Sequence, residues 1–358
     1  MGRRQPEKWR LAWVYERYIL SITSEENYDK LIFTALMQSK PAADIKVVLL
    51  TMFEPGHGQA GELTRFCKGL NLQPWPLAAF PVGSLWRNNS GVAALVAGVG
   101  PVNTAVSVMT LGLQTGLDWR KTYWLVCGIA GGNPKICSLG SPMFAEWVVD
   151  GDLAIDLHPS DCPPQWPTGI LPLGAKKPFG RADHSAGLFG HPAQVFHLNP
   201  RLAAWASRVA QRAKLFDSRP LAALRKNYNA FAHGASAPAV DRGDVLSSAR
   251  FWHGPSHQAW AERWIKYWTK DRGRLATASM EDSGTLGALR QLDHLQKVDW
   301  QRVLVMRSVS NYTLPPPGVP AEKHLTGDTS INYPGLEAAL ENGWRAGQTV
   351  LNALLVMK

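Results

Sequence analysis

The sequence predicts an α/β protein: a single domain with a mainly parallel or mixed central sheet that helices flank. Apolar runs of strand length alternate with helix-like stretches along most of the 358 residues. These runs are apolar at successive positions, which is typical of strands buried on both faces of a sheet. The composition, 45% hydrophobic and 18% charged, is that of a globular chain that can bury a large core.

The regular alternation begins at residue 45. "IKVVLLTMF", residues 45–53, is a continuous apolar run rich in β-branched residues and is predicted to be a strand. Pro101 stands where the first turn of a helix is expected, a position that proline tolerates. The elements after the first strand are predicted, in order, as a helix over 61–70, a strand over 91–100, a helix over 101–117 and a strand over 122–131.

The second half of the chain is predicted to be more decorated. Residues 158–195 are rich in Pro and Gly, and so long a stretch without regular structure indicates an insertion or an active-site flap. Residues 1–43, charged and weakly helical, are predicted to be an appendage to a domain that spans 44–358. The later elements are predicted as helices over 198–216, 219–232, 256–270 and 278–292, a strand over 302–311 and a closing helix over 335–357.

The net charge of +10 is concentrated in one part of the chain. Between Arg201 and Arg274 there are 14 Lys and Arg against 5 Asp and Glu. Arginines at roughly helical spacing are typical of solvated helix faces, and a phosphate-bearing partner is the alternative. Because no RNA- or DNA-binding motif accompanies the charge, we expect no nucleic-acid partner.

Metal, disulfide and membrane functions have little support in the sequence. The four cysteines include no CxxC pair, and Gly254-Pro255 separate His253 from His257, so we predict no metal and no cofactor. No run approaches the about eighteen apolar residues that cross a bilayer. Charged residues near the N-terminus also interrupt the apolar core that a signal peptide would need. We expect a soluble, cytoplasmic protein, or a secreted or periplasmic one if the natural start differs.

A glycine-rich loop follows the strand at 122–131. In "LVCGIAGGNP", residues 125–134, the glycines form neither GxGxxG nor a GKS/GKT loop, which excludes the two common phosphate cradles. In an open parallel sheet, ligands bind beyond the carboxyl ends of the strands. Three further strand ends, at "TMFEPG", "AGVGPVN" and "RSVSNYTLPPPG", also carry Gly, Pro, Asn or a carboxylate. They either line one crevice with this loop or are ordinary turns.

Several of these segments resemble one known family. From about Ile45 to the C-terminus, "GIAGGNPK", "LGSPMFAEWVVD", "QWPTGILPLG", "MEDSGTL" and "RSVSNYTLPPPG" occur in the order found in the purine nucleoside permease family. That family is similar to the nucleoside phosphorylase and nucleosidase superfamily. The resemblance implies a nucleoside phosphorylase-like fold, a small-molecule purine nucleoside as ligand, and a homo-oligomer.

The resemblance also implies where the nucleoside binds. The backbone of Ala130 and Gly131 would face the purine, and side-chain bulk there would push the base away. Glu281 would accept hydrogen bonds from ribose hydroxyls, while Met280 packs on the sugar. Asp282 lies in the same helix turn. For both acids the alternative is a carboxylate favoured at a helix N-terminus by the helix dipole.

Other residues are expected at the base and the sugar. Asn311, paired with Ser310, stands where many relatives carry an aspartate as general acid. An amide cannot deliver a proton, but its NH2 can donate to N7 and stabilise the leaving purine, unless this Asn is only a turn residue. Phe251 and Trp252 could stack on the base. Asn103 lies near the sugar or in the first turn of its helix.

The nucleophile is predicted to be water. Phosphorolytic relatives grip phosphate with an arginine and a Ser or Thr, where this chain has Val126 and Ile129, and an aliphatic pair cannot neutralise a dianion. Ile129 would contact the substrate instead. Glu54, in the loop after the first strand, would be the base for water. The predicted activity is hydrolysis of a purine nucleoside to free base and ribose. A phosphorylase and a non-catalytic nucleoside-binding protein associated with transport are the alternatives.

Overall fold

The computed structural model describes residues 44–54, 60–75, 85–181, 195–326 and 334–357. Residues 45–358 make one compact unit. The expected appendage at 1–43 lies outside the described residues, as does 182–194 of the expected insertion.

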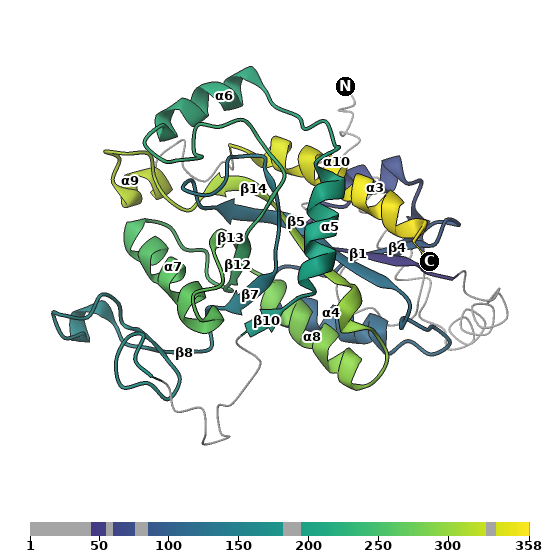
Figure 1. Cartoon of the computed structure of the whole chain (residues 1–358), viewed down its shortest axis with the longest axis horizontal. Coiled ribbons are helices and arrows are strands. Elements are labelled where there is room, and N and C mark those ends of the chain that lie inside the picture. The colour runs from purple at the N-terminus through teal and green to yellow at the C-terminus, as the bar shows by residue number, and fades with distance from the viewer. Residues whose placement is uncertain (1–43, 55–59, 76–84, 182–194, 327–333, 358) are drawn as a thin grey trace, which may run out of the picture. The chain divides into compact units, whose positions relative to one another are not determined.

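One sheet of 12 strands organises the described part of the chain (Figure 1). Its main path runs β10-β7-β12-β13-β5-β1-β4-β3-β2, and β14, β6 and β11 continue from β5. β1 is parallel to β4 and β5, whereas β13 is antiparallel to β5, so the sheet is mixed. The bounds are β1 Val47–Thr51, β2 Gln73–Pro74, β3 Leu85–Arg87, β4 Val92–Val96, β5 Tyr123–Gly132, β6 Pro142–Phe144, β7 Trp147–Asp150, β10 Val195–His197, β11 Asp241–Arg242, β12 Asp244–Ser247, β13 Leu275–Ser279 and β14 Val303–Tyr312.

Helices cover both faces of this sheet. The side chains of β1 alternate: Val48 and Leu50 belong to a core that α4 and α8 complete, and Val47 and Leu49 belong to a core with α3, α5 and α10. This arrangement confirms the predicted α/β class. The helices are α3 Thr64–Gly69, α4 Pro101–Gly112, α5 Pro200–Ala210, α6 Arg219–Arg225, α7 Pro255–Thr269, α8 Asp282–His294, α9 Ala321–Thr326 and α10 Leu336–Leu355.

The helix predicted over 278–292 is wrong at its start. Residues Leu275–Ser279 form β13, which pairs in parallel with β12 and antiparallel with β5, and α8 begins only at Asp282. The small residues of "LATAS" give a weak strand signal. Hydrogen bonds from both neighbouring strands decide their conformation.

The described part of the Pro- and Gly-rich passage, with the residues just before it, forms a small arm. β8 (Ala154–Asp156) and β9 (Ile170–Pro172) pair antiparallel in a separate two-stranded sheet. In Figure 1 this arm projects from the body beside α7.

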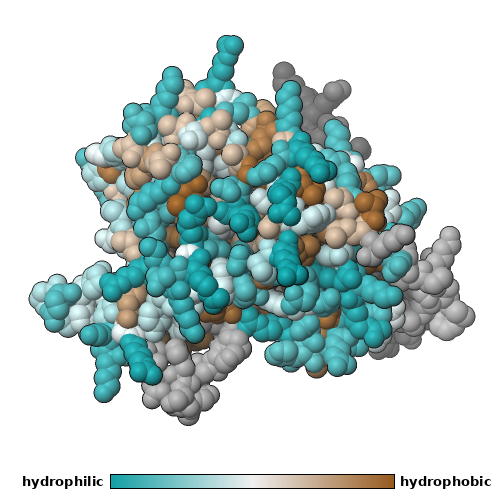
Figure 2. All heavy atoms as spheres, viewed as in Figure 1, coloured by the Kyte–Doolittle hydropathy of each residue, from teal (hydrophilic) through white to brown (hydrophobic). Residues whose placement is uncertain are grey.

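Part of the basic segment lies on solvent-exposed surface, whereas Arg225 in α6 is buried and pairs with Asp217 at 2.7 Å. Arg201, Arg208 and Arg212, in and just after α5, are all exposed, and Figure 2 shows mainly hydrophilic side chains over this face. Within the described residues, no helix is both long and apolar enough to cross a bilayer.

Candidate functional site

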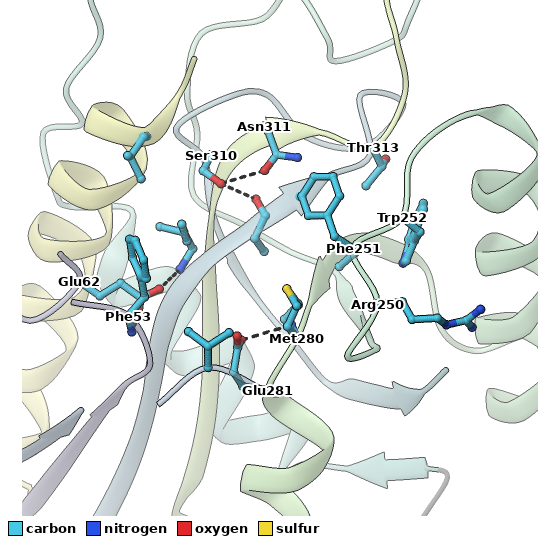
Figure 3. A pocket seen from close by; sticks show the side chains of 17 residues that line it. Phe53, Glu62, Arg250, Phe251, Trp252, Met280, Glu281, Ser310, Asn311 and Thr313 are labelled. Carbon is cyan, nitrogen blue, oxygen red and sulfur yellow. Dashed lines mark hydrogen bonds between the residues drawn. The ribbon is translucent and has the colours of Figure 1, made fainter. Parts of the chain in front are cut away.

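A pocket of about 290 Å³ opens where β5, β13 and β14 end (Figure 3). The three strand ends bring together segments that are far apart in the sequence. Nine of the residues predicted from the sequence line it: Ile129, Ala130, Gly131, Phe251, Trp252, Met280, Glu281, Ser310 and Asn311. Among the described residues, no three His, Cys, Asp or Glu side chains lie close enough together to hold a metal ion.

A bulge in β14 presents Asn311 to the pocket. The register of β14 against β5 passes from Val309 opposite Ala130 to Asn311 opposite Gly131, so Ser310 is the extra residue. Ser310 Oγ lies 3.0 Å from Asn311 Oδ1 and can donate to it, which leaves the Nδ2 amide as a donor. A Cβ at Gly131 would lie 3.5 Å from that Nδ2, so the glycine leaves space beside the amide.

Glu62 is a pocket residue that the sequence did not indicate. It is only 6% exposed. Its Oε2 accepts from the amides of Met52 (2.6 Å) and Phe53 (3.1 Å), and its Oε1 accepts from the amide of Ile129 (2.7 Å). Burial raises the pKa of Glu62 to about 7, although Arg307 and the amides of Met52 and Ile129 oppose the rise. A carboxyl that titrates near neutral pH suits a general base.

Glu54, the base predicted from the sequence, lies outside the lining of this pocket. Its carboxylate accepts from the amides of Gly61 (3.2 Å), Leu63 and Thr64 (3.1 Å) and from the Thr64 hydroxyl (2.8 Å). It therefore holds the start of α3, where Leu63, the N-cap residue, offers no side-chain cap. This contact also fixes the chain next to Glu62. Glu54 and Glu62 both lie in the segment between β1 and α3, and only the folded structure shows that Glu62 is the one that lines the pocket.

Asp282 and Asn103 also lie outside the lining. Asp282 is fully buried and forms a two-point ion pair with Arg307: Nη2 to Oδ1 is 2.5 Å and Nε to Oδ2 is 3.1 Å. Asn103 is exposed, and its Nδ2 donates to the Val99 carbonyl within the start of α4. Asp282 therefore holds Arg307 in place beneath the pocket, and Asn103 stabilises the start of α4.

Glu281 lies beside the Met280 side chain at the N-terminus of α8. The Glu281 carboxylate is 3.1 Å from Arg307 Nη2 and 3.2 Å from the Met280 amide. Burial raises its pKa, while the Arg307 charge acts in the opposite direction. Glu281 thus presents a buried carboxylate to the pocket from a rigid helix start.

Arg307, in the middle of β14, is the buried cation under the site. Besides the two carboxylates of α8, it donates from Nη1 to the Ile129 carbonyl at 3.1 Å. A Cβ at Gly128 would lie 2.4 Å from Arg307 Nη1 and 2.9 Å from Glu62 Oε1. Glycine at 128 is therefore required by this cluster rather than by a ligand. A charged residue inside the apolar strand "VLVMRSV" was the signal that could have indicated it.

The pocket is lined by two buried carboxyl groups, Glu62 and Glu281, and by one exposed cation. Among the described residues that line it, Arg250 is the only lysine or arginine, and it lies 3.6 Å from Asp152 and 3.7 Å from Asp156. Figure 3 shows its guanidinium pointing away from the side where Glu62 and Glu281 lie. The pocket thus combines two carboxylates, an amide donor and an apolar wall.

The fold matches solved nucleosidases. A 5'-methylthioadenosine/S-adenosylhomocysteine nucleosidase from Helicobacter pylori superposes with a TM-score of 0.53 at 15% identity, covering 86% of this chain and 98% of that one. A futalosine hydrolase of H. pylori gives a TM-score of 0.53 at 15% identity, covering 87% and 98%. At this identity the likeness shows the fold alone.

The sequence comparisons point to a family with a different name. A purine nucleoside permease of Candida albicans is 28% identical over 271 residues, which are 75% of this chain and 64% of that protein. A probable purine nucleoside permease of Schizosaccharomyces pombe is 26% identical over 225 residues, 62% of this chain and 64% of that one. The chain thus matches less than two thirds of the length of these relatives. The model of the purine nucleoside permease family matches residues 44–357, so the chain belongs to that family.

Proposed function

We propose that this protein is a purine nucleoside N-ribohydrolase, which cleaves the N-glycosidic bond to give free base and ribose. The observation that carries the proposal is Glu62: a buried carboxylate with a pKa of about 7 that lines the same pocket as Glu281 and Asn311. The nucleosidase fold of the superposed structures supports the same reaction class.

In the proposed reaction, water attacks C1′ of the ribose. Glu62 takes the proton of this water as the new C–O bond forms, and the C1′–N9 bond breaks with its electron pair moving onto the purine. Glu281 accepts hydrogen bonds from the ribose hydroxyls and stabilises the oxocarbenium-like sugar. Asn311 Nδ2 donates to N7 of the departing purine, which takes its proton from solvent because an amide has none to give.

The charge of the pocket favours water over phosphate. A phosphate dianion would lie near the carboxylates of Glu62 and Glu281. Buried Arg307 is already paired with Asp282 and Glu281 and is fully covered. Desolvating the dianion without a cation costs several kcal/mol. We therefore place phosphorolysis second.

A nucleoside-binding protein without catalysis is the alternative that the family name favours. It would use the same pocket, and Phe251 and Trp252 would supply the apolar wall for the purine. The binding protein and the hydrolase differ only in whether free base appears.

The test is a chromatographic assay of the purified full chain with adenosine, inosine and guanosine, with and without phosphate. Free base without phosphate supports the hydrolase. Base that appears only with phosphate supports a phosphorylase, and the argument from the paired Arg307 would then be wrong. Nucleoside bound in calorimetry without cleavage supports the binding protein. Absence of both binding and cleavage contradicts the proposal.

A further inference from the structure

We propose that Asp152 is a positioning residue that holds the base wall of the pocket, and this inference rests on the proposed nucleoside site. The base wall is the loop of residues 248–254. Its Arg250, Phe251 and Trp252 line the pocket. The part from Phe251 to His253 has no regular hydrogen-bonded structure of its own. The position of the wall therefore depends on contacts from outside the loop.

The N-terminal end of the loop is fastened to Asp152. Asp152 Oδ1 accepts from the Ser248 hydroxyl at 2.6 Å, and Oδ2 accepts from the Ala249 amide at 2.5 Å. The Arg250 guanidinium lies 3.6 Å from the same carboxylate. One side chain thus contacts three consecutive residues of the loop, and bonds of this kind to a carboxylate are stronger than neutral ones.

Asp152 is itself held rigidly. It belongs to a turn after β7 in which Asp150 Oδ1 accepts from the amides of Asp152 (2.9 Å) and Leu153 (2.7 Å). The Gly151 amide donates to the Ser247 carbonyl at 2.7 Å. A rigid turn beside β12 is therefore the fixed point from which the loop departs.

The loop is also joined to the sugar end and to the far strand. The Ser248 amide donates to the Ser279 carbonyl at 2.9 Å, just before Met280 and Glu281. At its other end the Gly254 amide donates to the Thr313 carbonyl at 2.9 Å, two residues after Asn311. If Asp152 is removed, the loop keeps these anchors but loses the contacts that hold Ser248, Ala249 and Arg250, directly before Phe251.

Asp152→Asn tests this role, because it keeps the volume and removes one acceptor and the charge. We expect the Kd of the protein for inosine, adenosine or guanosine to rise about tenfold, since a small misplacement of a binding wall weakens binding. The kcat should change by less than about twofold, because Glu62, Glu281 and Asn311 do not contact Asp152. Hydrogen exchange at residues 249–252 should accelerate. Asp156→Asn is the matched control. The Asp156 carboxylate also lies near Arg250, at 3.7 Å, but its side chain is 64% exposed, against 29% for Asp152. This variant should leave all three readouts unchanged.

An unchanged Kd and unchanged hydrogen exchange at 249–252 in Asp152→Asn would overturn the proposal. A fall in kcat together with a loss of stability of the whole fold would overturn it as well, because the substitution would then act on the entire structure. If the native protein binds no nucleoside, the proposed function fails. In that case hydrogen exchange alone decides the role of Asp152. Accelerated exchange confined to 249–252 still supports it, and unchanged exchange refutes it.

Discussion

The chemistry proposed for the pocket depends on individual residues, above all on two glutamates eight positions apart. Glu54 accepts hydrogen bonds from the start of α3, whereas Glu62 accepts from the amides of β5 and the loop after β1. The first contact is structural, and the second leaves a buried carboxylate beside the pocket. Substitution can separate the two roles.

Glu62→Gln should lower kcat by about 10²- to 10⁴-fold, the usual range for loss of a general base. The measurement is release of free purine at pH 7.5, with melting temperature as a check on folding. Glu54→Gln is the control. It should keep most of the activity but lose about 1 kcal/mol of stability in urea unfolding, because it weakens a helix cap. Loss of activity only in the Glu54 variant would contradict the assignment.

Asn311 offers a second test at this scale. Asn311→Ala removes the amide donor, and we expect kcat to fall about 10²- to 10³-fold, as for other removed donors to a developing anion. The KM should change much less, and steady-state kinetics over a range of nucleoside concentrations measures both. An unchanged kcat would show that Asn311 is only a turn residue.

At the scale of elements, the glycine-rich segment that the sequence predicted to be a loop is part of β5, and its first glycine has a packing role. β5 carries Gly128 over Arg307 and Glu62, and a Cβ there would collide with both. β14 carries Arg307 and, after the bulge, Asn311, so the register of two central strands fixes the distance between the charge cluster and the base end. Packing between strands, rather than a ligand, accounts for Gly128.

Gly128→Ala should therefore destabilise the protein by about 1–3 kcal/mol, the usual cost of overpacking. It should also lower activity, because Arg307 and Glu62 must shift. Gly287→Ala, in α8, is the control: a Cβ there meets nothing within 4 Å. That variant should be neutral or more stable by about 1 kcal/mol, since alanine favours a helix. Urea unfolding of both variants gives the comparison, and equal stabilities would contradict the packing argument.

At the scale of the whole molecule, the buried acid affects stability as a function of pH. The pKa of Glu62 is about 7 in the folded chain, above its ordinary value of 4.5, so the folded state binds this proton more tightly than the unfolded state. The stabilisation is complete below about pH 4.5 and is lost as the pH rises through about 7. The folded protein is therefore less stable at the pH at which Glu62 is ionised and can act as a base.

Glu62→Gln should remove this pH dependence. Relative to the native protein, the free energy of unfolding of the variant should rise by about 3 kcal/mol between pH 4.5 and pH 8, as a shift of this size implies. Urea unfolding at several pH values measures the difference. A difference between the two proteins that does not change with pH would show that Glu62 has the same pKa in the folded and unfolded states, and would contradict the raised value.

The assembly expected from the family resemblance remains a proposal at this scale. Sedimentation velocity of the full chain should give a mass that is a multiple of the 39.4 kDa of one copy. A species of 39.4 kDa at micromolar concentration would contradict the expected homo-oligomer.

The sequence by itself determined the fold class and indicated nine of the residues that line the pocket. Long apolar strands such as β5 and β14 carry their own signal, and the residues directly after them must meet at one edge of a parallel sheet. The strand-end argument indicated the segments that carry Ala130 and Asn311, and the family resemblance supplied Met280 and Glu281, which the sequence placed inside a helix.

Only the tertiary structure decided which charged groups are buried together. Glu62 is separated from Arg307 by 245 positions, and nothing local distinguishes it from Glu54. Its raised pKa arises from burial, which outweighs the opposing effects of Arg307 and of the amides of Met52 and Ile129. Likewise, β13 is a strand because its neighbours supply hydrogen bonds, and Asp152 holds the base wall because β7 ends beside β12. Interactions between segments distant in sequence leave no local pattern, since burial and charge depend on where the whole chain folds.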